Sequence, residues 1–293
     1  MFRITLCFAA GFAVCAQASL AAEPAVVLPA TSKWQLDYGK QTCRLARAFG
    51  EGENLSIVYF TQHGPDDGFE LTLAGEPLKR FAANTVIQFG PAGGEWETDP
   101  FKGDVEGVGP ALIYSGINLA EEPDEGEPEE DFTEAMDRLP AIDIERARGM
   151  EYIEVRQRKR VVRFDTGLLD APFAALNACS EDLINEWGLN LDQHRSMTRM
   201  VDWTNSKQIV SRVVRDYPVA ALRKGEQAII RALLIVGADG KVERCTLDNA
   251  TNSDALPAPA CKALEDAIFE PALDSQSQPM RSFYITKIVY KMG

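Results

Sequence analysis

The sequence predicts an α+β protein, in which a β-rich N-terminal domain ending in a helix is followed by a small C-terminal domain with a ββαβ order. Short apolar runs separated by Gly, Pro, Asn and Asp recur through the first half of the chain, as in antiparallel sheets. Apolar residues at helical spacing then extend from Asp170 to Trp187, and two strands, a helix and a strand follow Tyr217. The predicted divisions are a signal at 1–22, a domain at 23–190, a linker at 191–216 and a domain at 217–293.

Composition limits the classes of partner. The chain has 293 residues, of which 45% are hydrophobic, so it contains enough apolar material for a core in each domain. Its formal net charge of −14 disfavours nucleic acids and anionic lipids as default partners of the whole surface, although a local basic patch can behave differently.

The first 22 residues have the pattern of a secretory signal. A positive charge at Arg3 precedes the apolar run Ile4–Val14, and Ala16-Gln17-Ala18 has the small-x-small spacing of a cleavage site. The apolar run is shorter than the ~20 residues of a membrane-spanning helix. We therefore expect export with cleavage after Ala18 or Ala22, and membrane association only in the alternative in which the signal stays as an uncleaved anchor.

Four cysteines remain after the signal, and in an exported protein they predict two disulfides. Three connectivities are open. We favour Cys43 with Cys179 and Cys245 with Cys261, because each pair then closes within one predicted domain. None of these cysteines has the C-x-x-C spacing of a zinc or redox site, and no metal or cofactor is predicted.

The N-terminal domain has a series of strand signals after a lead-in at residues 23–32, which its Ala and Pro content predicts to be flexible. Leu55–Phe60 and Phe69–Leu73 are predicted to form a hairpin, since the segment between them has turn composition. Thr85–Phe89 and Ala111–Tyr114 are further predicted strands. Together they indicate a mostly antiparallel sheet structure.

Two charged segments follow. Residues 121–134 contain nine carboxylates and no basic residue, which predicts a solvated acidic loop; a calcium site is the alternative, but the segment lacks the spacing of a calcium-binding loop. The basic cluster downstream is predicted to be a solvated strand face, with a site for an acidic peptide or polyanion as the alternative. The cluster comprises Arg146, Arg148, Arg156, Arg158, Lys159, Arg160 and Arg163.

Asp165-Thr166-Gly167 matches the catalytic tripeptide of aspartic proteases, but that chemistry needs two such carboxylates sharing a proton. The tripeptide occurs once, and Asp170-Ala171-Pro172 after it predicts a helix start capped by Asp170. A peptidase using Asp165 is therefore only a weak alternative. His63 and His194 have no partner at a catalytic or metal-binding spacing and are predicted to be surface residues. We expect a protein that is not an enzyme, with no catalytic residue.

The C-terminal elements are predicted at Ile229–Val236, Lys241–Leu247, Cys261–Phe269 and Phe283–Tyr290. The turn Asp239-Gly240 joins the first two strands, and Pro271 predicts that the helix ends at about Glu270. Residues 232–236 are apolar without alternation, which predicts a strand that is covered on both faces.

This segment resembles the C-terminal domain of TonB-like proteins. The matching features are Tyr217-Pro218, the turn at 239–242, Leu256 before the helix, Phe269-x-Pro271-Ala272 and the closing strand. Residues 249–253 and Pro257 depart from the pattern in the loop before the helix. A cysteine pair like Cys245 and Cys261 also occurs in a subset of these proteins.

The resemblance implies a periplasmic protein of a Gram-negative bacterium that binds a short peptide, such as a segment of an outer-membrane receptor, by strand addition to its last strand. The residues implied are Phe283, Tyr284, Ile285, Thr286, Lys287, Ile288, Val289 and Tyr290. The alternatives are that this strand only completes the domain or pairs with a second copy in a homodimer. Energy transduction for outer-membrane transport is a further alternative if the N-terminus is an anchor; the sequence lacks a long Pro-rich spacer, so we favour a soluble interaction protein.

Overall fold

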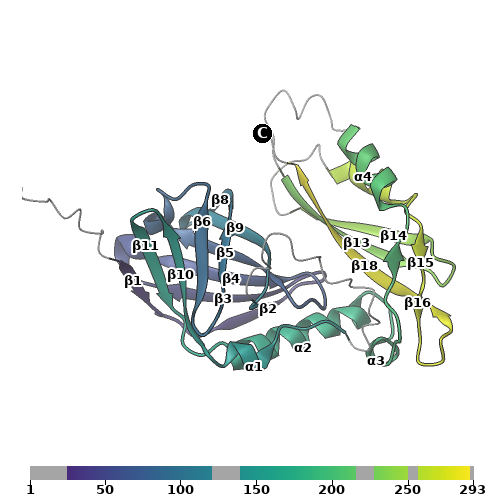
Figure 1. The fold of residues 1–293 in the computed structure, drawn as a ribbon, viewed down its shortest axis with the longest axis horizontal. Helices are drawn as coiled ribbons and strands as arrows, with labels where there is room; N and C mark the ends of the chain where they lie inside the picture. The colour runs from purple at the N-terminus through teal and green to yellow at the C-terminus, as the bar shows by residue number, and fades with distance from the viewer. Residues whose placement is uncertain (1–24, 121–138, 216–227, 250–256, 291–293) are drawn as a thin grey trace, which may run out of the picture.

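The computed structural model describes residues 25–120, 139–215, 228–249 and 257–290 (Figure 1). In these ranges the N-terminal domain contains a six-stranded sheet with the order β2-β3-β4-β5-β9-β8 and a five-stranded sheet with the order β1-β11-β10-β6-β7. The strands are β1 (Val26–Pro29), β2 (Gln35–Tyr38), β3 (Cys43–Phe49), β4 (Ser56–Gln62), β5 (Phe69–Gly75), β6 (Thr85–Pro91), β7 (Glu95–Thr98), β8 (Phe101–Val105), β9 (Gly109–Ile117), β10 (Met150–Gln157) and β11 (Arg160–Asp165). Short 3-10 turns occupy Gly52–Asn54 and Glu76–Leu78. The prediction of an α+β protein with a β-rich N-terminal domain is confirmed.

Aromatic side chains form the core between the two sheets. The ring of Phe60 from β4 lies 5.1 Å from Phe69 of β5 and 4.8 Å from Phe173 of the long helix α2 (Asp170–Glu186). Phe69 in turn lies 5.7 Å from Phe89 of β6, in the other sheet. The predicted hairpin is present, since β4 and β5 pair antiparallel. Burial of these large rings in edge-to-face contacts accounts for much of the apolar surface removed from water here.

The prediction of a flexible lead-in at residues 23–32 is wrong in part, because Val26–Pro29 forms β1, which pairs in parallel with β11. Leu28 is buried in the core, and the carbonyl of Pro29 accepts a hydrogen bond from the backbone N–H of Gly50. Composition alone could not show this, since the partner strand lies more than a hundred residues further along the chain. Long-range pairing outweighs the local preference of an Ala- and Pro-rich segment.

Helix α2 follows the short helix α1 (Ile144–Ala147) and is joined to β3 by the disulfide Cys43–Cys179. The predicted capping role of Asp170 is wrong by one position: Leu169 is the N-cap residue, and Asp170 is the first helical residue, with a carboxylate oxygen 3.8 Å from Nε of Arg148. A carboxylate in the first turn still interacts favourably with the helix dipole. The helix ends before Gly188, whose φ of 79° suits glycine, as predicted.

The stretch between the domains contains α3 (Leu191–Arg195), β12 (Asp202–Trp203) and α4 (Ser206–Arg215). Helix α4 lies at the end of the segment 191–216, which the sequence predicts to be a linker. The stretch is also attached to the C-terminal domain, since β12 pairs with β15 (Phe269–Glu270) and Arg199 forms an isolated bridge with Leu273. Its role as a linker between domains stays a prediction.

The C-terminal domain is built on an antiparallel three-stranded sheet with the order β14-β13-β18. These strands are β13 (Ala228–Val236), β14 (Val242–Asn249) and β18 (Ser282–Tyr290). A short hairpin of β16 (Ala272–Leu273) and β17 (Pro279–Met280) precedes β18 in the chain. The second disulfide, Cys245–Cys261, joins β14 to helix α6 (Pro257–Leu264). Both disulfides are the pairs favoured by sequence, and the ββαβ order is present.

The predicted helix at 261–269 is displaced, because α6 ends at Leu264 and Phe269 belongs to β15. The backbone at this point is bonded to other segments: the N–H of Phe269 donates to the carbonyl of Gly240, and the carbonyl of Ile268 accepts from the N–H of Thr204. Ile268, which lies within the predicted helix, is exposed. Hydrogen bonds to distant segments therefore override a helical apolar spacing here.

Candidate functional site

The strand implied as the partner-binding element, Phe283–Tyr290, lies within β18 at an edge of the C-terminal sheet. Its Cα register with β13 runs from Ser282 opposite Val236 to Tyr290 opposite Ala228. Among the described residues, no strand pairs with the other side of β18. Its outer side therefore has the unpaired backbone N–H and C=O groups of an edge strand.

The two faces of β18 meet different parts of the molecule. Phe283 packs against Trp187 at the end of α2, with ring centroids 5.0 Å apart, and Ile285 lies close to Gly64 in the loop between β4 and β5. On the opposite face, the ring centroid of Tyr284 lies 5.1 Å from that of Phe269. The N-terminal domain thus covers one face of the sheet, and the segments around α6 cover the other. This explains the continuous apolar run in β13, whose residues 232–236 are all buried as predicted.

A groove of about 330 Å³ runs along β18 between the two domains. Five consecutive residues of β18, from Phe283 to Lys287, line one side of it. The segment from Thr61 to Glu70 lines the other side, together with Gly116, Pro140, Met200 and Arg231. The edge of the last strand is therefore one wall of a cavity whose second wall belongs to the N-terminal domain.

An ion pair joins the domains beside this groove. Nη2 of Arg231 on β13 lies 2.8 Å from Oε2 of Glu70 and 3.3 Å from Oγ of Ser115. Lys287 is the Cα partner of Arg231 on β18, so its ammonium is on the same face at the edge. Burial lowers the pKa of Lys287, the charge of Arg231 lowers it further, and Glu70 partly offsets both effects.

His63, predicted as a surface residue, is largely buried in the same groove. Burial, with the nearby charges of Arg231 and Arg44, lowers its pKa to about 3. Its ring is therefore neutral at pH 7, and Nδ1 lies 3.7 Å from a carboxylate oxygen of Asp248 on β14. A neutral imidazole can donate one hydrogen bond and accept another.

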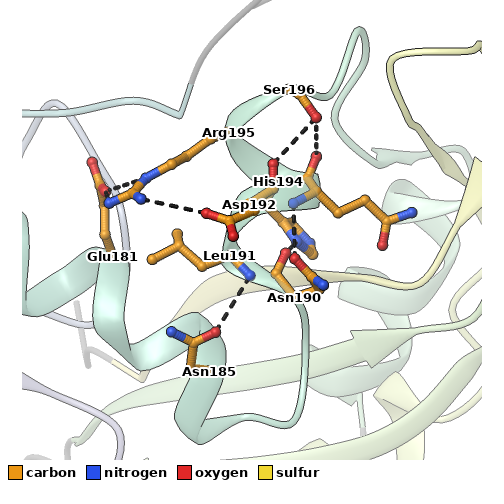
Figure 2. Close-up of polar contacts among 9 residues, drawn as sticks. Glu181, Asn185, Asn190, Leu191, Asp192, His194, Arg195 and Ser196 are labelled. Carbon is orange, nitrogen blue, oxygen red and sulfur yellow. Dashed lines mark hydrogen bonds and ion pairs between the residues drawn. The ribbon is translucent and has the colours of Figure 1, made fainter.

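His194 is also buried, so the prediction of a surface position is wrong for it too. Figure 2 shows its setting in α3, where the side chain of Asn190 caps the helix by accepting from the N–H of Gln193 at 2.9 Å. Nδ1 of His194 donates to the carbonyl of Asn190 at 2.7 Å, which leaves Nε2 to accept from the hydroxyl of Ser282 at 3.1 Å. Burial lowers the pKa of His194, in keeping with the neutral ring that these bonds require.

The α2–α3 junction thereby holds the first residue of β18. Figure 2 shows two contacts that fix this junction: Arg195 donates to Glu181 of α2 at 2.7 Å, and the side chain of Asn185 accepts from the N–H of Leu191 at 3.3 Å. Across the interface, Nη2 of Arg244 on β14 donates to the carbonyl of Trp187 at 2.7 Å. The sequence around His194 gave no sign of its contact with β18, because Ser282 lies 88 positions further along the chain.

Several buried side-chain nitrogens in or beside the groove have no hydrogen-bond partner among the described residues. They are Nε of Arg231, Nε1 of Trp187 and both ring nitrogens of His63. The first two can only donate, and a buried donor without an acceptor costs about 1–3 kcal/mol. The interface is therefore chemically suited to a ligand with oxygen acceptors, such as the carbonyl groups of a peptide.

The other residues singled out by sequence lie apart from this groove. Asp165 is exposed at the end of β11, and the carbonyl of Thr166 after it accepts from Nη1 of Arg47 at 2.6 Å. The acidic segment 121–134 and the signal at 1–22 lie outside the described residues. In the described ranges no three His, Cys, Asp or Glu side chains are grouped as metal ligands, and no helix is long and apolar enough to span a membrane.

Comparison with known families bears on the C-terminal domain. Residues 214–292 match the family model described as Gram-negative bacterial TonB protein C-terminal, which confirms the resemblance for this part of the chain. The matched range includes β13, β14, α6 and β18, and leaves out the N-terminal wall of the groove. No curated protein matches the chain.

Proposed function

We propose that the chain is a non-enzymatic periplasmic interaction protein, and that its C-terminal domain binds an extended peptide by strand addition to β18. The observation that carries this proposal is that the outer edge of β18 lines a groove while its inner edge pairs with β13. An extended peptide that pairs with such an edge gains main-chain hydrogen bonds along its length. The family match supports an interaction role in general.

The length of the groove indicates the size of the segment that it takes. Residues Phe283–Lys287 line it, and at about 3.3 Å per residue these five positions correspond to a strand of roughly 17 Å. A bound peptide would therefore contribute about five residues. Because the segment from Thr61 to Glu70 faces the same space, the N-terminal domain contributes to which side chains are accepted.

The unpartnered donors of the groove complement such a ligand. A strand that pairs with β18 on one side has its remaining carbonyl groups on the other side. Nε of Arg231 and the ring nitrogens of His63 are buried beside this space without a hydrogen-bond partner among the described residues, so an oxygen acceptor that reached them would satisfy them. The class of partner implied by the family is a segment of an outer-membrane receptor, and a second copy of this chain is the alternative partner. Energy transduction for outer-membrane transport is an alternative function only if the signal is retained as an anchor.

Hydrogen exchange at single residues tests strand addition directly. In the free protein, alternate amides of β18 are bonded to β13 and should exchange slowly, while the amides between them should exchange fast. A peptide selected from a phage-displayed library of random heptapeptides should slow the second set. The amides of β14, the other edge of the sheet, serve as the internal control and should not change.

Three results would contradict the proposal. Failure of the protein to select any peptide would remove the binding function, and slowed exchange without alternation along β18 would remove strand addition. Slowing of the same amides at high protein concentration without peptide, together with a dimeric mass in sedimentation equilibrium, would assign the edge to a homodimer.

A further inference from the structure

The arginines of the basic cluster that follows the acidic segment separate into two groups in the structure. Its members on α1 and on the inner part of the β10–β11 hairpin are neutralised by carboxylates. Arg156 lies against Glu95 at 2.5 Å, and Arg163 is 2.8 Å from Glu154 and stacks on Tyr152. Arg146 and Arg148 pair with Asp143 and Glu145. Each of these cations therefore has a carboxylate partner close by.

The second group is different. The guanidinium groups of Arg158 and Arg160, with that of Arg80 from the segment before β6, make no hydrogen bond, ion pair or ring contact within the described residues. Every other arginine side chain in those ranges makes at least one. All three line one trough. It consists of two hollows of about 590 and 360 Å³ that share Arg80 and Arg160.

Local structure fixes where these guanidinium groups emerge. Arg158 is in the turn between β10 and β11 with φ of 54°, a conformation that costs a non-glycine residue of order 1 kcal/mol or more. Gln157 beside it ties this turn to the neighbouring segment, because its side chain accepts from the N–H of Ala82 and donates to the carbonyl of Ala83. The three cations thus come from two segments that are bonded together.

Apolar side chains adjoin the cations. The larger hollow is lined by Val26, Phe81 and Val162 in addition to Arg80 and Arg160. Val26 of the edge strand β1 is 38% exposed, and its neighbour Val27 is 51% exposed. Glu76 also lines this hollow but is paired with Lys79 at 2.8 Å. The trough therefore combines unneutralised arginines with one exposed valine, Val26, while Val27 points to the opposite face of β1.

We propose that this trough docks the protein onto a membrane surface through phosphate-bearing lipid headgroups. Guanidinium groups bind phosphate oxygens in a bidentate manner, and the exposed side chain of Val26 suits the boundary between headgroups and acyl chains. A net charge of −14 makes the rest of the surface repel an anionic bilayer, so attachment through this patch orients the protein. Figure 1 shows β1 and β11 at the end of the molecule away from β18, which leaves the groove clear of the membrane.

Vesicle co-sedimentation tests the proposal with matched variants. The trough variant carries Arg80→Gln, Arg158→Gln and Arg160→Gln. The control variant carries Arg146→Gln, Arg148→Gln and Arg195→Gln, which removes the same charge from arginines that are paired with carboxylates. The probes are vesicles of phosphatidylcholine alone and of phosphatidylcholine with an equal part of phosphatidylglycerol.

We expect the wild type to bind the anionic vesicles in a salt-dependent manner and the control variant to match it. Each basic residue near an anionic membrane contributes about 1 kcal/mol, so the trough variant should partition about a hundredfold more weakly. An unchanged thermal midpoint would show that the trough variant is folded. Equal losses in both variants, equal binding to neutral vesicles, or no binding by the wild type would each overturn the proposal. So would binding of soluble polyglutamate in place of vesicles, which would indicate an acidic polypeptide partner.

Discussion

Replacing Arg231 by Met should weaken the attachment of the C-terminal domain, because it leaves Glu70 without its ionic partner in the domain interface. The side chains of Arg231 and Glu70 are only 14% and 9% exposed, and their charged atoms are 2.8 Å apart. Removing one member of a buried pair costs about 3–5 kcal/mol; the remaining exposure of both groups reduces our expectation to about 2–4 kcal/mol for Arg231→Met or for Glu70→Gln. The double variant should lose less free energy of unfolding than the sum of the losses in the two single variants.

Urea unfolding of the wild type, both single variants and the double variant gives the coupling free energy between the two side chains. We expect at least about 1.5 kcal/mol. The pair Lys79–Glu76 is a matched control, since it has the same 2.8 Å separation but exposures of 65% and 54%. The same cycle there should give about 0–0.5 kcal/mol. Similar coupling energies for both pairs would refute the argument that burial in the interface determines the strength of the Arg231–Glu70 pair.

Three further outcomes are expected. Lowering the pH from 7.5 to 5.5 should destabilise the wild type relative to His63→Gln by about 1 kcal/mol. The histidine becomes protonated in the unfolded state below pH 6.5, while in the folded state, with a pKa of about 3, it stays neutral; parallel stability curves in urea titrations would contradict this. Gly64→Val should open the domain interface, since even a Cβ at this position would lie 2.4 Å from Cδ1 of Ile285. Faster amide exchange along β18 would show this opening, whereas unchanged exchange would show that the loop between β4 and β5 shifts to make room for the side chain. Replacing Cys245 and Cys261 together by Ala should lower the free energy of unfolding by about 3 kcal/mol, as the disulfide closes a loop of 16 residues; a loss under about 1 kcal/mol would show that the tie adds little to the packing of helix against strand.

Much of the fold follows from local patterns. The hairpin β4–β5 and the strand β6 are at the predicted positions because apolar alternation and turn residues specify them within a few neighbours. The same patterns failed at Val26–Pro29 and at Phe269, where backbone groups pair with segments far away in the sequence. A residue whose hydrogen bonds are made at long range has no local signal to reveal them.

The site shows the same division. Sequence resemblance pointed to the last strand, and the spacing of the cysteines favoured the two disulfides that the structure contains. Neither histidine could be placed, since the partner of His194 is Ser282, and the pKa of His63 is lowered by burial and by the charges of Arg231 and Arg44. Likewise, the basic cluster is one run in the sequence, and only the folded chain shows which of its arginines have carboxylates within reach.

The sequence by itself determined the order of elements and the family matched by residues 214–292, because these depend on periodicity, turn chemistry and motif spacing. It also favoured the two cysteine pairs that each close within one predicted domain. The tertiary structure alone decided that β18 is an edge strand and that the N-terminal domain forms the opposite wall of its groove. The reason is physical: Glu70 and Arg231 are 161 positions apart, and the burial that gives their contact its strength exists only once both domains are folded and packed together.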